Sequence, residues 1–181
     1  CINTGTAAPI SCKKVAYGIH KSAIIMEQVQ ALFDNGWIYD CPTDGWCSIV
    51  VLAPKPHQEN CTDIKDFIWR LCISYRALNS VTKPFFFPIP RCEDALDNFG
   101  HGAGRLYWIS LDCKSGFHQI SVKLSDQEKL AFYLSDHSKS TFRVMPFGPM
   151  NALACYTALM FIMRREWQAL FAERFPDIDP S

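Results

Sequence analysis

The stretch RLYWISLDCKSGFHQI, from Arg105 to Ile120, decides the fold because an apolar run within it ends abruptly on a carboxylate and then turns. Aromatic and branched residues predict a largely buried strand over Leu106 to Asp112, between Gly104 and the Ser115-Gly116 turn. Such a strand delivers Asp112 to the rim of a sheet, where a hard cation such as Mg²⁺ finds oxygen ligands. The same carboxylate could instead cap the following turn, and this stretch alone leaves both interpretations open.

The composition predicts one compact unit with a substantial core. The chain has 181 residues, of which 49% are hydrophobic and 13% aromatic, so an intrinsically disordered chain is excluded. Lysine plus arginine equals aspartate plus glutamate at 18 each, so contacts with nucleic-acid phosphates must come from local basic patches. The sequence has neither an apolar run long enough for a bilayer nor a signal-peptide core, which predicts an intracellular location, cytoplasmic or nuclear, without membrane contact. A chain that starts at Cys1 is expected to be a piece of a longer protein.

Nine cysteines are scattered along the chain without any Cys-x-x-Cys pair. This spacing argues against a zinc site, and the absence of a secretory signal predicts reduced thiols that pack as small apolar residues.

The first half of the chain predicts a lead-in, a helix and a hairpin. Residues 1–21 form an irregular lead-in or linker, and a helix capped by Ser22 runs to Asn35-Gly36. Strands over Trp46 to Ala53 and Phe67 to Ser74 should pair in antiparallel fashion, with the polar segment from Lys55 to Asp66 at their tip.

The second half predicts two helices and a second hairpin. A helix should cover Arg91 to Phe99, and strands over Leu130 to Leu134 and Thr141 to Met145 should pair. Asn151 can cap a final helix that packs beneath the sheet, and residues 176–181 form a polar tail. The glycines between residues 100 and 104 follow a helix and precede a strand, so they predict a turn and not a phosphate-binding loop.

Three segments in order resemble the reverse transcriptase domain of Ty3/gypsy-type long-terminal-repeat retrotransposons. They are WRLCISYRALNSVTKPFFFPIPR (Trp69 to Arg91), ISLDCKSGFHQI (Ile109 to Ile120) and FRVMPFGPMNALA (Phe142 to Ala154), and the resemblance covers roughly Ile24 to Met163. It implies an α+β fold with the fingers and palm of a right-hand polymerase, in which a mostly antiparallel sheet packs on helices. On this basis residues 22–175 are a fingers and palm fragment whose palm is incomplete.

The resemblance implies nucleotide-binding roles for four residues. Arg70 would reach the triphosphate of the incoming deoxynucleotide, with Lys65 as a second phosphate contact. Phe117 would exclude a ribose 2′-hydroxyl, and Phe147 would lie against the nascent base pair. The residues by themselves allow plainer interpretations, because an arginine on a half-exposed strand is often only solvated and a phenylalanine is an ordinary core residue.

Contacts with template and primer follow from the same resemblance. Arg76 and Asn79 would position the template strand, and Gly148 would let the backbone approach the primer-template closely. Ser74 departs from the family pattern, which has aspartate just before the Tyr-Arg pair. The partners implied are an RNA or DNA template with its primer, deoxynucleoside triphosphates, and the rest of a polyprotein with thumb, RNase H and integrase.

Catalysis in this family requires two Mg²⁺ or Mn²⁺ ions, which Asp112 and the backbone carbonyl of Cys113 would hold together with carboxylates of a Tyr-x-Asp-Asp hairpin. The sequence has no adjacent Asp-Asp pair, and Asp177 and Asp179 lack flanking apolar strands. We therefore expect a retrotransposon RNA-directed DNA polymerase fragment that is inactive alone. The alternative is a non-catalytic nucleic-acid-binding remnant of a degenerate retroelement.

Overall fold

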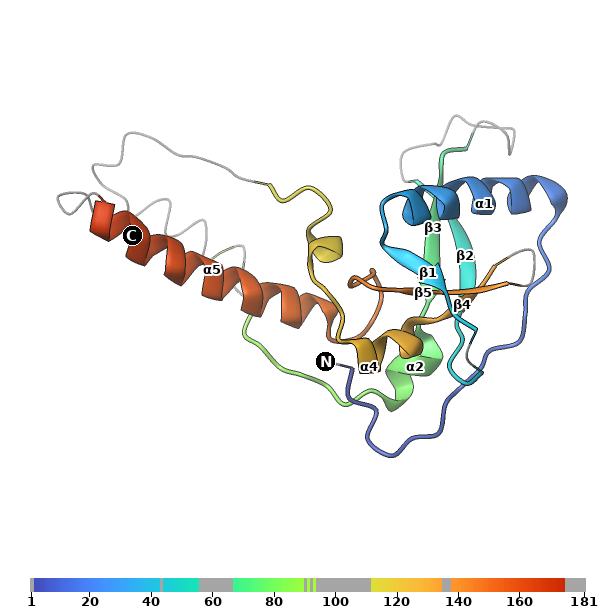
Figure 1. Cartoon of the computed structure of the whole chain (residues 1–181), viewed down its shortest axis with the longest axis horizontal. Coiled ribbons are helices and arrows are strands. Elements are labelled where there is room, and N and C mark those ends of the chain that lie inside the picture. Colours follow the sequence, from blue (N-terminus) through green and yellow to red (C-terminus); the bar gives the residue numbers. More distant parts are fainter. Residues whose placement is uncertain are drawn as a thin grey trace. The chain divides into compact units, whose positions relative to one another are not determined.

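Helices and short antiparallel strands make up this computed structural model (Figure 1), which describes residues 2–42, 44–55, 67–89, 91, 93, 112–134 and 138–174. Contacts divide the chain into two units. The first unit comprises Cys1–Pro84 and Phe117–Ala152, and the second comprises Phe85–Gly116 and Leu153–Ser181. The predicted strand from Leu106 falls outside the described residues except for Asp112, and of the helix predicted from Arg91 only Arg91 and Glu93 are described.

Helix α1 (Ile19–Asp34) opens the first unit and buries Ile25 and Val29. It ends at Asn35 and Gly36 as predicted, with Gly36 in the left-handed region that favours glycine. The prediction that Ser22 caps the helix is wrong. The N–H of Ser22 already donates to the carbonyl of Gly18 (2.9 Å), so Ser22 lies inside the first turn and Gly18 is the N-cap.

A three-stranded antiparallel sheet has the order β1-β5-β4, from β1 (Ile38–Asp40), β5 (Lys139–Phe142) and β4 (Phe132–Tyr133). The pairing of β4 with β5 confirms the second predicted hairpin. Its strands are shorter than expected, and Lys139 and Ser140 belong to β5 although the sequence placed them in the turn. Ser140 pairs with both β1 and β4, and Lys139 pairs with β4 and accepts from the N–H of Cys41 (2.9 Å). These backbone contacts hold both polar residues in the strand and override their turn-like composition.

The strands β2 (Ile49–Pro54) and β3 (Trp69–Ser74) pair in antiparallel register from Ile49 opposite Ser74 to Pro54 opposite Trp69, which confirms the first predicted hairpin. Its predicted tip lies outside the described residues beyond Lys55, whose N–H donates to the carbonyl of Ile68 (2.9 Å).

The core of the first unit is a continuous apolar cluster contributed by α1, the strands and the connecting turns. Its buried members are Ile25, Val29, Ile38, Trp46, Val50, Tyr75, Leu78, Leu130, Phe132, Leu134 and Phe142. Burial of each large side chain contributes about 1.5–3 kcal/mol of transfer free energy. The connections around this cluster are the short helices α2 (Arg76–Val81), η2 (Gly116–Gln119), α4 (Leu124–Gln127) and η3 (Glu128–Leu130).

Residues 2–18 of the predicted lead-in are irregular and are tied to the first unit by hydrogen bonds, whereas residues 19–21 already belong to α1. The N–H of Ile2 donates to Asp126 (2.9 Å), and the N–H of Cys12 donates to the carbonyl of Cys47 (2.8 Å). These bonds hold the segment against the core without regular structure.

Helix α5 (Ala152–Arg174) directly follows Asn151 and runs through the second unit. Its apolar stripe was expected to pack, but Met163, Trp167 and Leu170 are 50%, 56% and 66% exposed. A periodic stripe indicates which face of a helix can be buried and does not supply the surface that buries it. Among the described residues, no helix is both long and apolar enough to cross a membrane.

Candidate functional site

A pocket of about 880 Å³ lies in the first unit along the outer edge of β3. It is lined by Gln28, Leu32, Lys55, Trp69, Arg70, Leu71, Cys72, Ile73, His118, Phe142, Pro146, Phe147 and Gly148. Three of the predicted site residues therefore meet at one cavity, because Arg70 lines it together with the distant neighbours Phe147 and Gly148.

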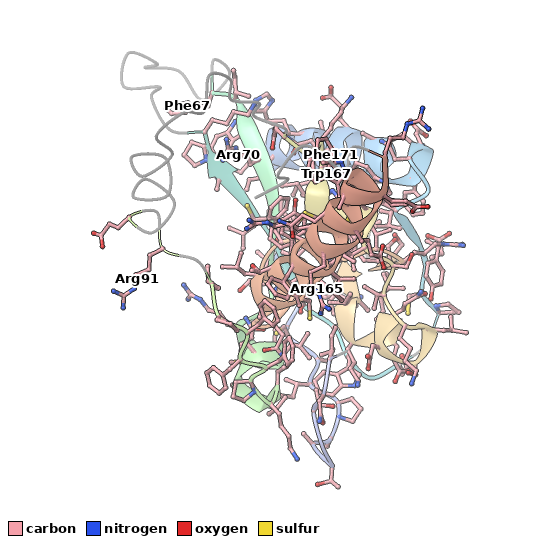
Figure 2. The ribbon with its side chains drawn as sticks, turned by 90° about the vertical axis from the view of Figure 1, so that its left-hand side faces the viewer. Phe67, Arg70, Arg91, Arg165, Trp167 and Phe171 are labelled. Atoms are coloured by element: carbon pink, nitrogen blue, oxygen red, sulfur yellow. The ribbon has the colours of Figure 1, made fainter. Side chains whose placement is uncertain are left out.

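Strand β3 carries Arg70, which Figure 2 labels beside that strand. Burial alternates along the first part of β3, because Trp69 and Leu71 are partly buried while Arg70 and Cys72 are exposed. Arg70 makes no ion pair with any described residue. Its planar, permanently charged guanidinium is thus available to an anionic ligand that enters the pocket.

Phe147 and His118 line the same pocket, and the rings of Phe117 and Trp37 pack against them without lining it. Phe117 lies in η2, and its ring meets the ring of Phe147 edge-on with centroids 4.8 Å apart. His118 contacts Phe147 at 5.7 Å and stacks on Trp37 at 4.2 Å. Burial among these rings lowers the pKa of His118, which favours the neutral imidazole. This group of rings is therefore uncharged.

Gly148 meets the conformational demand of the loop after β5. Its φ is +106°, and a Cβ there would approach Tyr75 Cδ2 at 3.3 Å and the carbonyl oxygen of Ile73 at 3.4 Å. Tyr75 is fully buried and its hydroxyl donates to the carbonyl of Leu130 (3.1 Å). Burial raises the pKa of Tyr75 well above its usual range, so the loop rests on a neutral phenol.

Asn79 holds the same loop from α2. Its Nδ2 donates to the carbonyl of Gly148 (2.9 Å), and its Oδ1 accepts from the N–H of Met150 (2.8 Å). Arg76, at the start of α2, is exposed. Sequence reasoning missed this loop-holding contact of Asn79, because nothing in its local pattern points to residues about seventy positions away.

Sequence reasoning also missed Gln28 and His118 as pocket residues. A usable signal existed for Gln28, because it is a polar residue on the α1 stripe that Ile25 and Leu32 otherwise make apolar.

Asp112 and Cys113 belong to the second unit, where both side chains are exposed. The turn that follows them lies against Tyr156 of α5, since a Cβ on Gly116 would come within 2.8 Å of the Tyr156 hydroxyl oxygen. A hydrogen bond with the Cys113 side chain is the main cause that raises the pKa of Tyr156. The Asp112 turn is therefore seated on α5.

A magnesium ion takes about six oxygen ligands in octahedral geometry and usually keeps several waters. Within residues 2–42, 44–55, 67–89, 91, 93, 112–134 and 138–174, no group of three or more His, Cys, Asp or Glu side chains could hold a metal ion. The described residues thus do not make a complete site around Asp112. Lys65, Asp177 and Asp179 lie outside the part of the chain that the structure describes.

Comparison with solved structures gives the fold. The chain is similar to the foamy viral protease-reverse transcriptase, solved in complex with an RNA/DNA hybrid, with a TM-score of 0.66 and 20% identity. The match covers 91% of this chain and 20% of that one. The α+β class expected from the sequence is confirmed as the fold of a reverse transcriptase.

Sequence comparisons give the family. Residues 57–177 match the model of the family described as "Reverse transcriptase (RNA-dependent DNA polymerase)". The chain therefore belongs to the reverse transcriptase family, and the resemblance carried by its three motifs is confirmed.

Its relatives include retrotransposon polyproteins. The chain is 32% identical over 167 residues to the retrovirus-related Pol polyprotein from transposon opus of Drosophila melanogaster. This match covers 91% of this chain and 16% of the polyprotein. It is 38% identical over 91 residues to an RNA-directed DNA polymerase homolog of Oenothera berteroana. This second match covers 50% of this chain and 61% of that protein. The chain thus spans about a sixth of the opus polyprotein.

Proposed function

We propose that residues 22–175 serve as the fingers and palm portion of an intracellular RNA-directed DNA polymerase that copies a primed RNA or DNA template within a longer polyprotein. The observation that carries the proposal is the pocket in which Arg70, Phe147 and Gly148 meet, with the ring of Phe117 against Phe147. The family match supplies the reaction class.

In this proposal the pocket receives a deoxynucleoside triphosphate. Arg70 binds the triphosphate, and the absence of a carboxylate partner among the described residues supports this role. Phe117 lies under the sugar and excludes a 2′-hydroxyl, while Phe147 lies against the base pair. Lys65 adds a second phosphate contact.

The template strand lies along α2 in the same proposal. Arg76 is exposed and binds template phosphate. Asn79 acts through the loop that it holds, which keeps Gly148 open to the primer-template.

A Mg²⁺ or Mn²⁺ ion would be held by Asp112 and the carbonyl of Cys113, with further carboxylates supplied by the rest of the polyprotein. The thumb, RNase H and integrase are the other partners that we propose from its retrotransposon relatives. A pair of metal ions would activate the primer hydroxyl and stabilise the leaving pyrophosphate.

Sugar selection tests the proposal. The chain should bind dATP more tightly than ATP, and Phe117→Val should reduce that preference by relieving the clash with the 2′-hydroxyl. Calorimetric titration of both nucleotides into both proteins measures the effect. If Phe117→Val kept the preference for dATP over ATP, Phe117 would be an ordinary packing residue and would not select the sugar.

We propose further that the chain alone does not extend a primer. One carboxylate cannot hold two divalent cations, and losing such electrostatic stabilisation costs on the order of 10²-fold or more in rate. A primed template with Mg²⁺ or Mn²⁺ and four deoxynucleotides tests this. Extension that disappears in Asp112→Asn would show that a second carboxylate, such as Asp177 or Asp179, completes the site.

Weak primer-template binding without extension fits both this proposal and a non-catalytic nucleic-acid-binding remnant. Supplying the remainder of the polyprotein distinguishes them, because only the polymerase fragment should then support Asp112-dependent extension.

A further inference from the structure

We propose that Gln28, on α1, positions Arg70 for binding a nucleoside triphosphate by holding the two peptide groups that flank it. This inference rests on the proposed triphosphate contact of Arg70. It assigns a function to a residue of the helix that opens the first unit.

Both ends of the Gln28 side chain bond to the backbone of β3. Its Nε2 donates to the carbonyl of Trp69 (3.0 Å), and its Oε1 accepts from the N–H of Leu71 (2.8 Å). We call this pair of bonds the Gln28 bridge. The side chain also lines the pocket, but its acceptor and its amide nitrogen are both engaged by backbone, so it acts through Arg70.

The two bonded groups belong to the two peptide planes on either side of Arg70. The Trp69 carbonyl is in the same planar unit as the N–H of Arg70, and the N–H of Leu71 is in the same unit as the carbonyl of Arg70. Fixing both planes fixes the two backbone dihedrals of Arg70 and hence the direction of its Cα–Cβ bond. The bridge therefore fixes the direction in which the Arg70 side chain leaves the backbone.

The bridge lies at the edge of β3 that pairs with no other strand among the described residues. Arg70 lies opposite Ala53 of β2 in a two-stranded sheet, so the backbone groups of Trp69 and Leu71 point to the outer edge of β3. Unpaired groups on an edge strand leave it free to fray. Gln28 satisfies one acceptor and one donor there, as a neighbouring strand would.

The helix behind the bridge is anchored in the core. Gln28 lies between Ile25 and Val29, which are 0% and 1% exposed. Two turns earlier, the Nζ of Lys21 lies 5.5 Å from the centroid of the Trp69 ring. Helix α1 therefore contacts β3 through both Gln28 and Lys21, and Gln28 connects the edge of β3 that carries Arg70 to a helix that is fixed in the core.

Amide hydrogen exchange of the whole chain tests the bridge itself. Gln28→Met keeps the side-chain volume and helix propensity and removes both bonds, so exchange at the Leu71 amide should accelerate by about tenfold or more. Gln30→Met is the matched control, since Gln30 is on the same helix and, among the described residues, its side chain bonds only to Asp34. Gln28→Glu keeps the acceptor and should retain protection at Leu71. Unchanged Leu71 exchange in Gln28→Met would overturn the inference.

A double-mutant cycle with dATP tests the action through Arg70. Gln28→Met should weaken dATP binding by about 2-fold to 10-fold, equivalent to the loss of about one net hydrogen bond, whereas Gln30→Met should leave affinity unchanged. The same Gln28→Met change in an Arg70→Ala background should have no further effect. An equal loss in both backgrounds, or no loss with Arg70 present, would overturn the positioning role.

The cycle also separates this inference from the proposed function. If Arg70→Ala alone leaves dATP affinity unchanged, the triphosphate contact fails and the positioning role fails with it. If Arg70→Ala weakens binding and Gln28→Met does not, only the positioning role fails.

Discussion

The two units of the chain differ in how their functional side chains are held. In the first, the pocket rests on a closed core, with Tyr75 and Phe132 almost fully buried and Asn79 bonded to the Gly148 loop. In the second, Asp112 is exposed and the apolar side chains along the second half of α5, such as Trp167, are exposed too. The difference indicates that a buried core preorganises the pocket lined by Arg70, whereas Asp112 and the second half of α5 have little cover among the described residues.

The largest expected effect is a difference in the free energy of unfolding between one substitution in the first unit and one in the second. Phe132→Ala removes a ring that is 0% exposed and lies 5.4 Å from Phe142, so it should lower the free energy of unfolding by about 3–5 kcal/mol. Trp167→Ala, on the exposed face of α5, should change it by about 0.5 kcal/mol or less. Urea unfolding measures both, and similar losses would contradict the contrast between the units.

Two glycines should give a smaller difference in the same direction. Gly148→Ala combines a φ of +106° with a close approach to buried Tyr75, and should cost about 1–3 kcal/mol. Gly116→Ala meets only the far end of the Tyr156 ring, which can move aside, and should cost less than about 1 kcal/mol. Thermal unfolding of the two variants compares them. A larger loss at Gly116 would show that the Asp112 turn is the more rigid region.

The smallest effect should be a pH dependence centred on His118. Because burial lowers its pKa in the folded state, the unfolded chain binds the proton first as the pH falls. Stability from His118 is therefore fully present above its ordinary pKa of about 6.5 and is lost as the pH falls below that value towards the folded pKa. His118→Gln should flatten this part of the stability profile. A wild-type slope that persists below pH ~6.5 in His118→Gln would contradict this prediction.

The sequence predicted both hairpins and the family because strand composition and turn residues are local signals, and three ordered motifs reinforce one another. It misplaced the start of α1 because Ser22 is a good cap in isolation, whereas the backbone enters the helix earlier at Gly18. It also expected the final helix to pack beneath the sheet, whereas Met163, Trp167 and Leu170 of α5 are exposed. The apolar periodicity of a helix is encoded in the helix alone, whereas the burial of its apolar face also depends on the element that packs against it.

The sequence predicted those site residues that belong to a recognisable motif. It did not predict the residues whose part in the site depends on tertiary contacts. Arg70, Phe147 and Gly148 were identified in advance as site residues, and the pocket brings them together. The contacts of Gln28 and Asn79 join backbone groups more than forty residues away, so no local pattern identifies their partners, although a polar Gln28 on the apolar α1 stripe marks that residue as unusual. The assigned roles of the site residues stay predictions, and Lys65 lies outside the described residues.

Titration of dATP into the chain and two arginine variants tests the central claim most directly. Arg70 lines the pocket on β3, and Arg165 lies on α5 in the second unit, where it is exposed (Figure 2). Arg70→Ala should weaken dATP binding by about tenfold or more, as expected for a lost charged hydrogen bond, and Arg165→Ala should leave it unchanged. Equal effects of the two substitutions, or none from Arg70→Ala, would contradict a triphosphate pocket in the first unit.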